Sequence, residues 1–138
     1  MKINVKQKDC RFYVDENARK VVCVIPRTRD MVLDFIDYFP VQWCMLGKKA
    51  KELLLPSSFT GVATCHPNDE FNVETGKLIA FHKAKHKLCT SFFKRANKFV
   101  NYVDEELNKT MDRFNDFGDR LSEAANAREN EIQKRLGV

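Results

Sequence analysis

The second half of this chain lacks proline and carries a helical repeat, which constrains its fold more than any other feature. Pro67 is the last of the four prolines, so none occurs from Val73 to Leu136. Apolar residues recur there at steps of three and four, the spacing of one face of an α-helix. They are Phe81, Ala84, Leu88, Phe92, Ala96, Phe99, Val103, Leu107, Met111, Phe114, Leu121, Ala125 and Ile132. The pattern predicts long helices, with 97–101 and Gly118 as candidate break points.

Such helices leave an apolar stripe that the shorter first half of the chain has little surface to cover. The spacing beyond residue 103 is close to a heptad, which is typical of helices that pack against other helices. We therefore expect a homo-oligomer. An intramolecular helical hairpin is the alternative.

The first half reads as short strands separated by turn residues. Residues 10–14 alternate loosely, and 21–25 form a continuous apolar run that ends at Pro26, so the two predict a hairpin. Residues 41–46 and 59–65 are further candidate strands, although Gly61 weakens the second.

Residues 31–39 have apolar side chains at helical spacing behind Asp30, a candidate N-cap, and predict a short helix. The predicted fold class is α+β, with a small antiparallel sheet in the N-terminal half followed by long C-terminal helices in an oligomer. We expect one domain over 1–138, β-rich over 1–66 and helical over 72–136.

Composition narrows the class of protein. A chain of 138 residues corresponds to about one domain. No apolar run approaches the roughly 18 residues that cross a bilayer, and the first residues do not resemble a secretory signal. The five cysteines are odd in number and widely spaced, which favours reduced thiols in a cytosol.

The net charge of +5 is concentrated in one segment. Residues 75–103 hold seven basic side chains and no acidic one, whereas 104–138 hold six basic and nine acidic side chains. A basic block of this kind indicates an anionic partner or a solvated helix face.

The segment from Gly61 to Gly76 is the most distinctive local motif. Asn72 is a good N-cap for the following helix, and Pro67 orients a turn before it. The motif reads first as a strand-to-helix connection. A helix start can also hold an anion, but Asp69 and Glu70 disfavour a phosphate there.

Two histidines lie four residues apart in the predicted helix. His82 and His86 share a face, and Cys89 follows at helical spacing, so the three are candidate zinc ligands. The surrounding lysines oppose a cation, so the histidines fit a polar face or a pocket better than a metal site. We expect no metal and no cofactor. Catalytic motifs are also missing from the sequence, and we expect a binding protein rather than an enzyme.

The basic block is interleaved with aromatic residues, a combination that binds nucleotides by ring stacking and phosphate contacts. Phe81 and Lys85 are four apart and therefore adjacent on one helix face. Arg27 follows the second strand, and its planar guanidinium suits phosphates. The alternative for Phe81 is a place in the core.

The motif Gly-x-Ala-x-Cys-His-Pro-x-Asp-x-Phe at 61–71, followed by a helix, resembles small bacteriophage proteins. With the order of sheet and long helices, the chain is similar to the first type of phage Thoeris anti-defence protein. That family binds and sequesters a cyclic ADP-ribose isomer, without cleaving it, in the cytoplasm of the host bacterium.

The resemblance implies a sponge for a nucleotide second messenger such as glycocyclic ADP-ribose, with cyclic oligonucleotides as further ligands. It implies dimers that build into hexamers, with pockets between subunits. Arg27 and Phe81 match its arginine and aromatic positions, and Lys85 joins them on physical grounds. Lys109 or Arg113 stands where the family uses a C-terminal arginine for a second ligand. The alternative function is a nucleic-acid-binding or regulatory phage protein that uses the basic helix 77–98.

Overall fold

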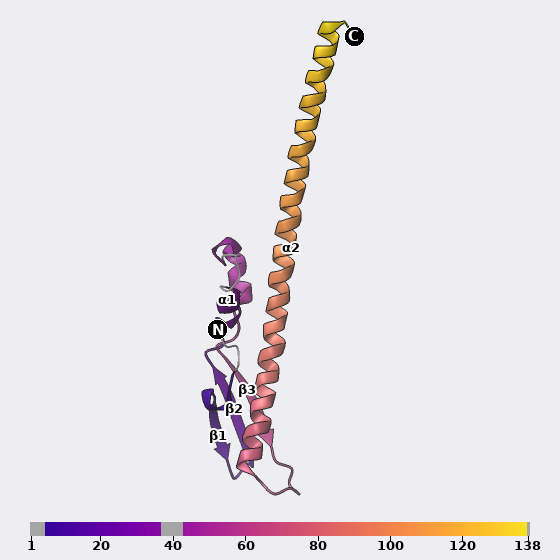
Figure 1. Ribbon diagram of the computed structural model, residues 1–138. Coiled ribbons are helices and arrows are strands. Elements are labelled where there is room, and N and C mark those ends of the chain that lie inside the picture. Colours follow the sequence, from indigo (N-terminus) through magenta and orange to yellow (C-terminus); the bar gives the residue numbers. More distant parts are fainter. Residues whose placement is uncertain (1–4, 37–42, 138) are drawn as a thin grey trace. The chain divides into compact units, whose positions relative to one another are not determined.

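Residues 5–36 and 43–137 are described by the computed structural model, with side chains described except over 43–46, and they form an α+β fold (Figure 1). The predicted fold class is confirmed: an antiparallel sheet precedes a long C-terminal helix. The elements are the 3-10 helix η1 (Gln7–Asp9), β1 (Arg11–Asp15), β2 (Lys20–Pro26), α1 (Met31–Ile36), the 3-10 helix η2 (Trp43–Leu53), β3 (Ser58–Thr64) and α2 (Val73–Leu136).

The sheet has the order β1-β2-β3, and both pairs are antiparallel. The predicted hairpin of β1 and β2 is confirmed, with Asp15 opposite Lys20 at its closed end. The carboxylate of Asp15 accepts a hydrogen bond from the backbone N–H of Ala18, at 3.0 Å, and so stabilises the turn. Along the central strand β2, the buried Val21, Cys23 and Ile25 alternate with the half-buried Val22 and Val24, so one face of the strand lies in the core and the other is partly covered.

The first turns of α2 pack on this sheet, and two glycines allow the close approach (Figure 1). A Cβ added at Gly61 in β3 would lie 2.5 Å from the backbone nitrogen of Ala84. A Cβ at Gly76 would lie 2.6 Å from Val21 Cγ2. The face of α2 turned inward is completed by the buried side chains of Ala80, Phe81, Ala84 and Leu88. The glycine that weakens β3 as a strand is therefore the residue that admits the helix.

The segment between β2 and β3 is held by backbone and hydroxyl hydrogen bonds. The buried hydroxyl of Thr28 donates to the carbonyl of Pro56, and the N–H of Leu55 donates to the carbonyl of Arg29, at 3.0 Å. The ring of Phe35 in α1 meets the ring of Phe92 in α2 edge-on, with centroids 5.9 Å apart. The ring contact joins α1 to the first part of α2.

The strand predicted at 41–46 is wrong over its described part. Residues 43–46 belong to η2, while 41 and 42 lie outside the described residues, as does the end of the helix predicted over 31–39. Hydrogen bonds of a 3-10 helix join residues three apart, so the backbone of this segment pairs with itself and not with the sheet. Gly47, at φ 57° and ψ −129°, turns the chain between two short 3-10 turns.

Contacts divide the chain into two compact units, 1–99 and 100–138. The first contains the sheet and the beginning of α2, and the second consists, in its described residues, of the remainder of α2 and a terminal turn. Helical hydrogen bonding continues through both candidate break points, 97–101 and Gly118. The unit boundary nevertheless coincides with the first of them.

Candidate functional site

Arg19 holds the connection that joins β3 to α2. It adopts a left-handed backbone conformation, with φ at 53°, in the β1–β2 turn. Its guanidinium donates to the carbonyl of Pro67 at 3.1 Å, to Cys65 Sγ at 3.4 Å, and to the carbonyl of Asp69. The N–H of Cys65 donates back to the carbonyl of Arg19, at 2.9 Å. The motif at 61–76 is thus the strand-to-helix connection that the sequence predicted, and the structure adds Arg19 as the residue that holds it.

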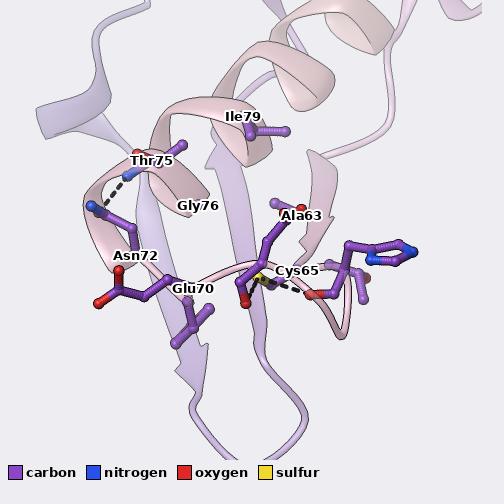
Figure 2. A pocket seen from close by; sticks show the side chains of 11 residues that line it. Ala63, Cys65, Glu70, Asn72, Thr75, Gly76 and Ile79 are labelled. Atoms are coloured by element: carbon purple, nitrogen blue, oxygen red, sulfur yellow. Dashed lines mark hydrogen bonds between the residues drawn. The ribbon is translucent and has the colours of Figure 1, made fainter.

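A small pocket of about 260 Å³ lies at the start of α2 (Figure 2). The side chain of Asn72 accepts a hydrogen bond from the backbone N–H of Thr75, at 3.1 Å, which confirms the predicted N-cap. Asp69 and Glu70 are among the lining residues. The cap occupies one helix-start donor and the carboxylates repel anions, so the pocket is poorly suited to a phosphate.

A larger hollow of about 600 Å³ lies between β3 and the outer face of α2, and we call it the basic groove. Its apolar surface comes from Val62, Leu78 and Ile79, whose exposed fractions lie between 40 and 47%. Its polar lining is two histidines and two lysines one helical turn apart: His82, Lys83, His86 and Lys87. None of these seven side chains is acidic.

The two groove lysines are tethered to the edge of the sheet. Lys83 Nζ donates to the carbonyl of Val62 at 3.1 Å, and Lys87 Nζ donates to the carbonyl of Thr60 at 2.9 Å. An ammonium group has three donors, so each lysine keeps two for another partner. The tethers also cover carbonyls at the outer edge of β3, which otherwise invite strand addition. The result is two positioned cations above an exposed apolar surface.

Phe81, the aromatic residue expected to stack on a ligand, is only 7% exposed. Lys85 Nζ lies 5.7 Å from its ring centroid, so these two expected site residues are brought together as a cation–π pair. Arg27 is exposed and lies beyond the rung that pairs Pro26 with Ser58. Phe81 follows Ala80, and Ala80 contacts β3 at Gly61. Gly61 is three residues, or about 10 Å, along β3 from Ser58, so Arg27 and Phe81 lie at different levels of the sheet.

Lys109 and Arg113, the residues expected at a second ligand site, belong to the second unit. Lys109 Nζ lies 3.3 Å from a carboxylate oxygen of Glu106, within one helical turn. Arg113 lines a separate hollow of about 330 Å³ with three neighbours on its own helix, Thr110, Phe114 and Phe117.

The sequence interpretation favoured a polar face or a pocket for His82 and His86 over a metal site, but it did not assemble the basic groove. The available signal was a repeated four-residue spacing with cations nearby. It places residues 78, 82 and 86 along one line of the helix and residues 79, 83 and 87 along the next. The partner strand could not be found this way. In the described part of the chain, no group of three or more histidine, cysteine or acidic side chains is arranged to hold a metal.

Cys23 is fully buried in β2 beside the thiol of Cys10. Burial, the neighbouring Cys10 and a hydrogen bond to it raise the pKa of Cys23 from the ordinary 9.0 to about 12. Burial also raises the pKa of Cys10. A thiol that stays protonated is a weak nucleophile, so this pair is unsuited to covalent catalysis near neutral pH.

The raised pKa of Cys23 predicts a loss of stability in alkali. The unfolded chain releases this proton near pH 9.0 and the folded chain near pH 12, so the free energy of unfolding should fall between these values. Denaturant titrations at pH 8, 10 and 11 measure it. Cys23→Ala should show a shallower decline, while Cys89→Ala, an exposed control, should follow the parent. Equal slopes for all three proteins would contradict the assignment.

Within the described residues, no helix is both long and apolar enough to cross a membrane.

Comparison with known proteins adds no relative. A scan of the sequence against protein-family models found no match, and searches among curated proteins and among solved structures found none either.

Proposed function

We propose that this chain is a non-catalytic binding protein that sequesters a small nucleotide-derived anion in the basic groove. The single observation that carries the proposal is the pair of tethered ammonium groups beside exposed apolar side chains, with no carboxylate in the lining. A nucleotide has a flat apolar base and an anionic phosphate group. The base would lie on Val62, Leu78 and Ile79, and the phosphates would meet Lys83 and Lys87.

Tethering favours this use because binding must immobilise fewer side chains. A free lysine loses about 1.5–2 kcal/mol of rotamer entropy when it is fixed. Part of that cost is already met in folding where the ammonium is held on a β3 carbonyl. The resemblance to phage Thoeris anti-defence proteins supports a cyclic ADP-ribose isomer as the ligand and the host cytoplasm as its place of action. The site proposed here differs from the expected one at Arg27, Phe81 and Lys85.

Isothermal titration with cyclic ADP-ribose, its glycocyclic isomers and a cyclic dinucleotide tests the proposal. We expect tight binding of at least one, and more than tenfold weaker binding by Lys83→Gln/Lys87→Gln, since hydrogen bonds to charged groups contribute about 1.5–3 kcal/mol each. The matched control, Lys94→Gln/Lys98→Gln, makes the same charge change at exposed lysines outside the groove lining. It should bind like the parent.

Recovery of the ligand separates sequestration from catalysis. Heat release of the bound molecule, followed by mass spectrometry, should return it unmodified. A cleaved product would indicate an enzyme, and no binding of any of these probes would contradict the proposal.

A second candidate function is nucleic-acid binding, because four exposed lysines share one stripe of α2. Lys83, Lys87, Lys94 and Lys98 follow one another at steps of four, seven and four, and all are exposed. Such a stripe would follow a phosphate backbone. It predicts binding of DNA or RNA that weakens steeply with salt, and equal losses in both double lysine variants.

A further inference from the structure

The second unit presents an exposed apolar stripe, and its described residues, 100–137, supply no second element to pack against it. Val100, Leu107, Phe114 and Leu121 follow one another at seven-residue steps, and Phe117 lies beside them. Their exposed fractions lie between 56 and 68%. Single helices draw most of their stability from packing of an apolar face rather than from intrinsic propensity. A helix with this face therefore calls for a partner.

The stripe has the geometry of a coiled-coil seam. In heptad notation the four residues at seven-residue steps occupy positions a, and Val103, Thr110, Phe117 and Ala124 occupy positions d. We call these eight residues the seam. Thr110, Arg113, Phe114 and Phe117 surround the hollow of about 330 Å³ at spacings of three, four and seven. Four residues at these spacings form the hole that receives a side chain from a facing helix.

We propose that the seam binds the seam of a second copy of this chain, with the two helices antiparallel. The proposal concerns residues 100–124 alone and is independent of the basic groove. In the register that pairs all eight residues, Val100 faces Ala124, Val103 faces Leu121, Leu107 faces Phe117, and Thr110 faces Phe114. Because a twofold axis relates the two copies, each of these four pairs occurs twice in the dimer.

Charges beside the seam favour this orientation. The g positions hold Glu106, Arg113 and Arg120, while the e positions opposite them in a parallel pair hold Met111, Gly118 and Ala125. A parallel pair would therefore make no ion pair between these positions. In the antiparallel register, Glu106 faces Arg120 of the other copy at both ends, and Arg113 meets its own counterpart once. A shift by one heptad either sets Arg113 against Arg120 twice or leaves Leu121 and Ala124 without seam partners.

Sedimentation of the full chain tests whether the seam binds a second copy. We expect a mass of two chains, each 16.1 kDa, and at least a tenfold weaker association for Phe114→Glu. Asn115→Glu, on the adjacent position outside the seam, should associate like the parent. Circular dichroism checks that each variant is folded. A monomer at all concentrations, or an assembly that Phe114→Glu leaves intact, overturns the proposal.

A charge exchange tests the orientation. Glu106→Arg and Arg120→Glu should each weaken the dimer several-fold, and the double variant should return to within about twofold of the parent. Each single change also removes a contact within the helix, to Lys109 or to Asp116. Residues 106 and 120 are fourteen apart, about 21 Å along a helix, so they cannot meet within one chain. Additive losses in the double variant would overturn the antiparallel arrangement.

Discussion

Gly61→Ala is expected to lower the free energy of unfolding by about 3 kcal/mol, the upper part of the range for overpacked cores. The new Cβ would lie 2.5 Å from the backbone nitrogen of Ala84. Backbone cannot rotate away as a side chain can, so β3 and α2 must separate. Urea denaturation followed by circular dichroism measures the change.

Gly118→Ala is the control for the Gly61 variant. Apart from the chain neighbours of Gly118 and the backbone of its own helical turns, the added Cβ meets no heavy atom of the described residues within 4 Å. Alanine is favoured over glycine inside a helix by about 1 kcal/mol, so this variant should be as stable as the parent or more stable. If Gly61→Ala is also neutral, the close packing of β3 on α2 is wrong.

Phe81→Ala is expected to cost about 3–5 kcal/mol, as for other large aromatic side chains removed from a core. The ring is 7% exposed, and its loss also removes the cation–π contact with Lys85. A ring that stacks on a ligand needs an accessible face. The predicted effect is therefore on the free energy of unfolding, measured by denaturant titration without ligand.

Phe93→Ala is the matched control, because Phe93 lies on the same helix and is 64% exposed. Its removal should change the free energy of unfolding by less than about 0.5 kcal/mol. Suppose instead that Phe81→Ala keeps the stability of the parent and loses nucleotide binding. Phe81 would then be a stacking residue, and the basic groove would not be the principal site.

Local features of the fold were predictable because their causes are local. The antiparallel hairpin followed from two apolar runs around a polar turn, and α2 followed from its spacing and the absence of proline. The Asn72 cap was predictable for the same reason, since its hydrogen bond to Thr75 spans three residues. The strand predicted over 41–46 was wrong in its described part, 43–46, because the backbone there pairs within the 3-10 helix η2 and not with an edge of the sheet.

The candidate site was less predictable because it depends on residues distant in the sequence. Phe81 and Lys85 were expected to meet, and they do, since four residues make one helical turn. The basic groove needs β3 beside α2, and its lysines are positioned by carbonyls 21 and 27 residues away. No spacing within the helix contains that information.

One helical repeat runs through Phe81, Ala84 and Leu88 and then through Leu107, Phe114 and Leu121, and the sequence by itself determined that both sets form the apolar side of a helix. Only the tertiary structure decided that they differ in fate. The sheet covers the first set, because Gly61 and Gly76 allow the helix to approach it. The second set lies in a unit whose described residues, 100–137, form no strand, and its side chains are exposed. Periodicity records which residues share a face, whereas burial depends on what the rest of the chain places against that face.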